Sequence, residues 1–206
     1  MPPLPPTDTV KARLMDAADV DRTLARLARQ IVEHLDDDGA AEGEAGRLAL
    51  VGMQTRGVHL ARRLRDKIEA FEGLRLPFGI LDATLYRDDF RARGSHAARR
   101  HPVVRETAIP FDVDDRRLVL VDDVVYTGRT TRAALDAVMD LGRPASVRFL
   151  AFIDRGLREL PVCPDFVGRT VPTVPGEEVR VRLEECDGED GVWLVGNAEF
   201  GGRDAE

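Results

Sequence analysis

A short stretch at residues 118–130, LVLVDDVVYTGRT, joins two adjacent acids to a group of hydroxyl and glycine residues. The four apolar residues at its start are typical of a strand that is buried on both faces of a parallel sheet. Asp122 and Asp123 are therefore expected at the C-terminal end of that strand. Ligands of open α/β sheets bind beyond this end of the strands, so the stretch places charge where a ligand is expected.

The residues that follow the acids favour a phosphate ligand. They are expected at the point where a loop enters a helix: Thr127, Gly128, Arg129, Thr130 and Thr131. Backbone N–H groups and hydroxyls can converge on a phosphate there, helped by the helix dipole, and a glycine lets the backbone approach closely. The two carboxylates would repel a phosphate but can accept hydrogen bonds from sugar hydroxyls. A ribose 5-phosphate satisfies both halves of the stretch.

Two other kinds of acidic strand end fit the sequence less well. A P-loop ATPase needs a glycine-rich loop that ends in Gly-Lys-Ser or Gly-Lys-Thr, and the chain contains no Gly-Lys pair. The paired acids of a response regulator belong to an early strand, whereas Asp122 and Asp123 come late in the chain.

The elements that must position these residues alternate between strands and helices. Apolar runs predict strands in RLALVGM, LPFGILDATLY and SVRFLAFID. Helical spacing predicts a helix that Asp16 caps, a second helix after Gln54-Thr55-Arg56-Gly57, and a third in TRAALDAVMDLGRP. This alternation predicts a parallel sheet with helices on its faces. Near the C-terminus, EEVRVRLEE and GVWLV predict short strands around a turn at residues 187–190.

Length and composition predict one domain without a membrane span. The chain has 206 residues, of which 43% are hydrophobic, and this is enough for one substantial core. No apolar run approaches the length of a membrane span and no signal peptide is evident, so a soluble cytoplasmic protein is expected. The net charge of -7 argues against nonspecific attraction of nucleic acid to the whole surface, although a local basic patch remains open.

The predicted organisation is a disordered leader over residues 1–13, a single domain over 14–195 and a tail over 196–206. Within the domain, residues from about 86 to 106 show no clear periodicity. A long segment of this kind in a compact domain usually forms a lid or a binding arm, so a flexible loop is expected here.

The acid and threonine stretch closely resembles the phosphoribosyl pyrophosphate (PRPP) motif of type I phosphoribosyltransferases. Further blocks resemble consecutive blocks of the PyrR family, which combines pyrimidine operon attenuation with uracil phosphoribosyltransferase activity: LVGMQTRGVHLARRL, LDATLYRDDF, LDAVMDLGRPASV and IDRGLRELPVCPDFVGRTVPT. The resemblance runs from about Leu14 to Val195. It implies an α/β, type I phosphoribosyltransferase-like parallel sheet flanked by helices, with a flexible loop and a small hood of short strands from parts of residues 155–195.

The resemblance also implies a reaction and a set of site residues. Uracil and PRPP would give UMP and pyrophosphate, with Mg²⁺ bound mainly through PRPP and with Asp122 and Asp123 as its candidate protein ligands. The implied PRPP-binding residues are Thr55, Arg56, Gly57, Asp122, Asp123, Val124, Val125, Tyr126, Thr127, Gly128, Arg129, Thr130 and Thr131. Those expected to be catalytic are Arg56, Arg87, Asp122 and Asp123, and those expected to bind uracil or nucleotide are Asp154, Arg155, Gly156 and Val179.

One position in the motif bears on the base. Purine phosphoribosyltransferases often carry Asp where this chain has Tyr126, which favours a pyrimidine acceptor such as uracil. Leu157 stands where the family pattern has His. Orotate and hypoxanthine remain alternative acceptors.

The regulatory half of the resemblance implies binding of pyrimidine operon leader RNA, modulated by UMP, in a homodimer or homotetramer. Arg26, Arg29, Arg158 and Arg169 match or replace the expected RNA-facing residues. Three positions depart from the pattern: Ala25, His34 and Cys163. Two alternatives therefore stay open. One is an RNA-binding regulator with vestigial catalysis, and the other is a salvage enzyme that has lost RNA binding.

Overall fold

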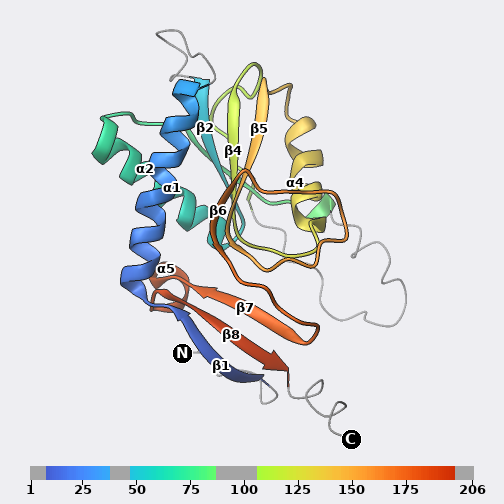
Figure 1. The fold of residues 1–206 in the computed structure, drawn as a ribbon. Helices are drawn as coiled ribbons and strands as arrows, with labels where there is room; N and C mark the ends of the chain where they lie inside the picture. The colour runs from blue at the N-terminus through green and yellow to red at the C-terminus, as the bar shows by residue number, and fades with distance from the viewer. Residues whose placement is uncertain (1–7, 38–46, 87–105, 198–206) are drawn as a thin grey trace, which may run out of the picture.

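The large sheet of the protein contains five parallel strands in the order β3-β2-β4-β5-β6 (Figure 1). The computed structural model describes residues 8–37, 47–86 and 106–197. The strands, in chain order, are β2 Leu48–Met53, β3 Phe78–Leu81, β4 Arg117–Val125, β5 Ser146–Asp154 and β6 Phe166–Thr170. The expected parallel sheet is confirmed, and β4 with its two acids lies at the centre of it.

Helices cover both faces of this sheet. Helices α1, Ala17–Asp37, and α2, Arg56–Glu72, pack on one face, and α4, Arg129–Met139, packs on the other together with the short 3-10 helix η2, Thr84–Tyr86. Alternate side chains of β4 serve the two faces: Val119 and Val121 lie in the core of α1 and α2, and Leu118 and Leu120 lie in the core of α4. Because both faces of the sheet are covered, β4 is apolar at every position from Leu118 to Val121.

Helix α1 begins where the sequence predicts. The Asp16 carboxylate accepts a 2.8 Å hydrogen bond from the Asp19 N–H, and the Asp19 carboxylate accepts a 3.1 Å hydrogen bond from the Asp16 N–H. Two otherwise unsatisfied donors of the first turn are thereby paired, which confirms Asp16 as the cap.

A second, antiparallel sheet has the strand order β1-β8-β7. Its strands are β1 Asp8–Met15, β7 Glu177–Arg182 and β8 Gly191–Asn197, and the one-turn helix α5, Glu184–Asp187, joins β7 to β8. We call these four elements the hood. Figure 1 shows the hood beyond the end of the large sheet where the loop from β4 to α4 lies.

Several expectations about the ends of elements are wrong. Residues 8–13 are not a disordered leader, because they belong to β1 and pair with β8. The tail was expected to begin at residue 196, but β8 includes its first two residues, 196 and 197. The expected turn at 187–190 begins inside α5, because Asp187 closes a helical turn with Leu183. The acids are not the last residues of β4, since the strand continues to Val125.

The expected flexible loop lies almost wholly outside the described residues, as do residues 1–7. Among the helices in the described parts of the chain, none is long and apolar enough to cross a membrane.

Candidate functional site

The sequence predicts a phosphate loop at the connection from β4 to the first turn of α4, and we use the name phosphate loop for this connection. Gly128 is the N-cap of α4 with φ 88°, a left-handed conformation in which glycine is favoured. A Cβ atom at Gly128 would lie 3.2 Å from the Cβ atom of Val162, so the loop is also closely packed. The Thr127 hydroxyl accepts a 3.4 Å hydrogen bond from the Arg129 N–H. The first turn of α4 can therefore present N–H groups and hydroxyls to an anion.

The two acids of β4 are neighbours near the end of the strand, and their side chains interact with each other. Asp122 is buried, and its carboxylate accepts a 3.0 Å hydrogen bond from the Asp123 N–H. Asp123 lies on the side of α2, where burial raises the pKa of its carboxyl and the positive charge of Arg56 opposes this rise. Two carboxylates with different surroundings thus flank the entrance to the phosphate loop.

The segment Thr55-Arg56-Gly57 begins α2 directly beside these acids. Thr55 is the N-cap and Arg56 is the first helical residue. A Cβ atom at Gly57 would overlap the carbonyl oxygen of Val121 and lie 3.2 Å from the Cα atom of Asp122. Only glycine lets the first turn of α2 approach the end of β4 this closely, and this approach brings Arg56 next to the acids.

The guanidinium of Arg56 also reaches the hood. Its Nη2 and Nε atoms donate hydrogen bonds of 2.7 and 3.0 Å to the two carboxylate oxygens of Asp187 in α5. Asp187 was not predicted from the sequence as a site residue. The only available signal was the acidic run from Glu184 to Asp190, which does not by itself identify a partner 131 residues away.

The expected base-binding segment follows β5. The Gly156 N–H donates a 2.8 Å hydrogen bond to the Asp154 carboxylate, and both Gly156 and Leu157 have positive φ, 70° and 56°. The buried Arg155 side chain lies over the ring of Tyr126, with its guanidinium carbon 4.1 Å from the ring centroid. Its Nη2 donates to the carbonyl of Glu177 at the start of β7, so Arg155 connects the segment to the hood.

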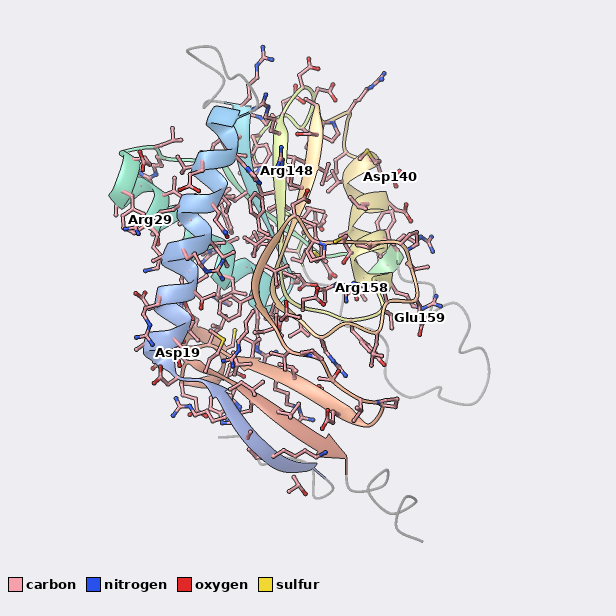
Figure 2. All side chains as sticks on the ribbon, in the orientation of Figure 1. Asp19, Arg29, Asp140, Arg148, Arg158 and Glu159 are labelled. Carbon is pink, nitrogen blue, oxygen red and sulfur yellow. The ribbon has the colours of Figure 1, made fainter. Side chains whose placement is uncertain are left out.

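Arg158 binds this segment to the phosphate loop. Its guanidinium donates to the carbonyls of Tyr126, Gly156 and Val162 at 2.9, 3.1 and 3.1 Å, and it pairs with the Asp154 carboxylate at 2.7 Å. Figure 2 shows Arg158 and Glu159 below α4 in the view, well away from Arg29 on α1. Glu159 forms a 2.7 Å ion pair with Arg129 of the phosphate loop.

The other residues expected to face RNA gather around α1. Arg26 donates to the carbonyls of Val167 and Gly168 in β6, and Arg169 of β6 donates to the carbonyl of Leu14. Arg29 is exposed and lies over the ring of Phe71, 5.1 Å from its centroid. Along the same face of α1 runs a hollow lined by Arg22, Ala25, Arg26, Arg29, Gln30 and Glu33.

The remaining expected residues have different positions. Val179 is buried in β7 and packs in the core with α1. Val124 and Val125 complete β4, while Thr130 and Thr131 lie in the first turn of α4. Arg87 is outside the described residues. His34 contacts the Phe166 ring at 5.2 Å between centroids, and Cys163 is exposed.

Comparisons with known proteins identify a family for this chain. Residues 14–185 match the phosphoribosyl transferase domain family. The chain is 53% identical over 184 residues to the bifunctional protein PyrR of Thermus aquaticus, covering 89% of this chain and 95% of that protein. It is 49% identical over 189 residues to the bifunctional protein PyrR of Pelotomaculum thermopropionicum, covering 92% and 98%.

Solved structures show the same fold at low sequence identity. The hypoxanthine phosphoribosyltransferase of Trypanosoma cruzi superimposes with a TM-score of 0.67 at 14% identity, covering 91% of this chain and 98% of that one. The HGPRT-ase of Leishmania tarentolae in complex with GMP gives a TM-score of 0.65 at 17% identity, covering 91% and 96%. These two likenesses concern the fold alone.

Proposed function

This chain belongs to the PyrR family of bifunctional proteins and is both a uracil phosphoribosyltransferase and a pyrimidine operon regulator, and from this we propose which of its residues perform each task. One observation supports the assignment most strongly. The first turn of α2, the acids of β4 and the first turn of α4 meet at one edge of the sheet, where Gly57 packs on Val121.

The phosphate loop binds the ribose 5-phosphate of PRPP, and the start of α2 binds the pyrophosphate. N–H groups and hydroxyls of residues 127–131 receive the phosphate at the N-terminus of α4. Asp122 and Asp123 accept hydrogen bonds from the ribose hydroxyls. Arg56 and the N–H groups around Gly57 receive the pyrophosphate, which is crowded and strongly anionic.

The reaction moves the ribose from pyrophosphate to uracil. A nitrogen of uracil forms a bond to the anomeric carbon, the bond from that carbon to the pyrophosphate oxygen breaks, and the uracil nitrogen loses its proton. Positive charge develops on the ribose in the transition state, while one bond breaks and the other forms, and the carboxylates of Asp122 and Asp123 stabilise this charge. The protein thus acts through position and charge and forms no covalent intermediate.

Magnesium suits this donor set. Asp122 and Asp123 offer carboxylate oxygens beside the phosphate loop, and within residues 8–37, 47–86 and 106–197 no three His, Cys, Asp or Glu side chains gather to hold a metal. Such a site suits an ion that takes most of its ligands from phosphates and water. When bound with PRPP, Mg²⁺ neutralises the charge of the leaving pyrophosphate.

Uracil binds between the segment Asp154-Arg155-Gly156 and the hood strand near Val179. The Arg155 side chain already lies over the Tyr126 ring and donates hydrogen bonds to the Thr173 hydroxyl at 3.3 Å and to the Glu177 carbonyl. The N–H groups of Arg155 and Gly156 already donate to Val125 and Asp154, so we assign the base to main-chain carbonyls of the segment, which can each accept a second hydrogen bond. Arg87 follows η2 directly in the chain, and we assign it as a further catalytic residue that acts on PRPP.

Leader RNA binds the face of α1 and β6 that carries Arg26, Arg29 and Arg169, with UMP modulating the affinity. Arg158 contributes to RNA binding indirectly, by fixing the segment between β5 and β6. The protein acts in the cytoplasm as a homodimer or homotetramer. The exposed Arg29 is the RNA contact whose loss can be tested most directly.

The catalytic assignment is tested by measuring UMP formation from uracil and PRPP with Mg²⁺, with orotate and hypoxanthine assayed in parallel. Uracil is the expected acceptor, and Asp123→Asn is expected to remove most of the activity. Equal turnover in the variant would overturn the site assignment. Preference for hypoxanthine or orotate would overturn the base assignment.

The regulatory assignment is tested by titrating the pyrimidine operon leader RNA with the full-length protein, with and without UMP, over a range of salt concentrations. Binding that strengthens with UMP is expected. Absence of binding at low salt would leave a uracil salvage enzyme, and tight binding without UMP formation would leave a regulator with vestigial catalysis.

A further inference from the structure

Arg56 and Asp187 connect two parts of the molecule that the reaction must bring together. Arg56 opens α2, and Asp187 closes α5 of the hood. Their bidentate pair has N to O distances of 2.7 and 3.0 Å, and the two side chains are 35% and 19% exposed. A bidentate, partly buried ion pair of this kind fixes the orientation of the guanidinium more strictly than an exposed ion pair does.

The carboxylate of Asp187 is itself held in place. Its Oδ2 atom accepts a 3.0 Å hydrogen bond from the Leu183 N–H, and the Asp187 N–H donates a 2.7 Å hydrogen bond to the Leu183 carbonyl. The residue that receives Arg56 is therefore fixed to the end of β7. The arginine is ordered by a rigid partner.

Only one edge of the Arg56 guanidinium is used by this pair. The Nε and Nη2 atoms face Asp187, and the edge that includes Nη1 remains able to donate to a second anion. Arg56 also interacts electrostatically with Asp123 at the end of β4. The guanidinium is thus positioned between the hood and the acids of the active site.

We propose that Asp187 is a positioning residue for PRPP, which holds Arg56 in the orientation that receives the pyrophosphate group. This inference rests on the proposed function, in which the start of α2 binds pyrophosphate. A long side chain that is already ordered loses less conformational entropy when the ligand binds, so the affinity for PRPP is higher with Asp187 than without it. The same gain applies to the product pyrophosphate, whereas uracil does not contact Arg56.

A neighbouring pair supplies the control for a purely structural role. Arg63 lies two turns further along α2 and donates to Glu185 of α5 at 2.7 and 2.9 Å and to Asp190 at 2.6 and 2.8 Å. It joins the same helix to the hood but has no part in the proposed pyrophosphate site. Glu185→Gln therefore weakens the same junction by the same chemical change as Asp187→Asn.

The test compares Asp187→Asn, Asp187→Glu and Glu185→Gln in full-length protein. The readouts are KM for PRPP, KM for uracil, inhibition by inorganic pyrophosphate and Tm. We expect Asp187→Asn to raise KM for PRPP and the inhibition constant of pyrophosphate about three- to tenfold, which corresponds to ordering one long side chain. KM for uracil should change no more than in Glu185→Gln, and Asp187→Glu should recover part of the loss.

Three results would overturn the inference: an unchanged KM for PRPP in Asp187→Asn, a lowered one, or a rise that Glu185→Gln matches. If Asp187→Asn does not fold, Asp187→Glu gives the same comparison. Arg56→Gln distinguishes the proposed pyrophosphate site from the proposed role of Asp187. A normal KM for PRPP in Arg56→Gln contradicts the proposed pyrophosphate site, whereas a raised value there with a normal value in Asp187→Asn contradicts the role of Asp187 alone.

Discussion

The guanidinium of Arg158 donates a 2.9 Å hydrogen bond to the main-chain carbonyl of Tyr126, and so the base-binding segment after β5 is tied to the phosphate loop after β4. The two loops follow neighbouring parallel strands whose pairing ends at Val125 and Asp154, and beyond this pair the Thr127 carbonyl accepts hydrogen bonds from the Glu159 and Leu160 N–H groups at 3.0 and 3.1 Å. Arg158 adds its side-chain donors to these main-chain contacts and so helps to fix the separation of the two loops.

Replacement of this arginine should cost both stability and activity. Arg158→Gln loses the ion pair with Asp154 and most of the hydrogen bonds to the three carbonyls, so we expect a loss of about 2–3 kcal/mol in the free energy of unfolding. Denaturant unfolding measures this loss. The control Arg29→Gln removes an exposed arginine and should change stability by less than about 0.5 kcal/mol. Equal stability of the two variants would show that Arg158 is not structural.

A methyl group at the phosphate loop should lower stability and weaken PRPP binding together. In Gly128→Ala, the left-handed conformation and the 3.2 Å approach to Val162 should cost about 1–2 kcal/mol and raise KM for PRPP. Gly73→Ala is the matched control, because Gly73 has φ 66° with no atom within 4 Å of the added Cβ. It should lose about 1 kcal/mol and keep normal kinetics. A normal KM in Gly128→Ala would argue against phosphate binding at this loop.

Removal of the charge at Asp123 should lower activity without lowering stability. Burial raises the pKa of this carboxyl, so its ionised form is disfavoured by folding, and Asp123→Asn should keep or raise Tm at neutral pH. We expect kcat to fall on the order of a hundredfold, because charge stabilisation at the ribose is lost. Asp136→Asn on α4, whose carboxylate pairs with Arg132 at 3.1 Å, should leave kcat unchanged. A lower Tm with normal kcat in Asp123→Asn would contradict the proposed catalytic role of Asp123.

The junction of α2 with the hood should weaken in acid. The side-chain hydrogen bonds from Arg63 hold the pKa of Asp190 below its ordinary value of 3.8. Because the pKa is lower in the folded protein, the stabilisation by Asp190 is fully present above the unfolded pKa and is lost as pH falls through the folded pKa. The difference in unfolding free energy between the wild type and Asp190→Asn should therefore be constant down to about pH 5 and shrink below 3.8. A difference that grows in acid would contradict this sign.

RNA binding should depend on the exposed arginine of α1 through its charge. Arg29→Gln should weaken binding to leader RNA and reduce the slope of log affinity against log salt by about one. Arg62→Gln is the control, since Arg62 on α2 is also exposed and lies over an aromatic ring, 5.4 Å from the centroid of Phe78 in β3. An equal effect of the two substitutions would show a general charge effect and no RNA face on α1.

Local features of the sequence were sufficient to predict the large sheet except for β6, Phe166–Thr170. The apolar run before Asp122 predicts β4, helical spacing predicts α2 and α4, and the Asp16 cap marks the start of α1 because each depends on neighbours a few residues apart. The residue types around Gly128 predict a phosphate loop for the same reason: the loop's conformation and its donors come from adjacent positions. Family resemblance then named the chemistry that these residues serve.

Only the tertiary structure decided the contacts between distant segments. Residues 8–13 carry no strong strand signal, yet they form β1 because β8 offers an edge to pair with. Asp187 lies in an acidic run that reads as a turn, and its pairing with Arg56 depends on how the hood meets α2. Arg158 matches an expected RNA-facing position, but the carbonyls around it bind its guanidinium. Such partners are fixed by the packing of whole elements, so no pattern within a short stretch of sequence could identify them.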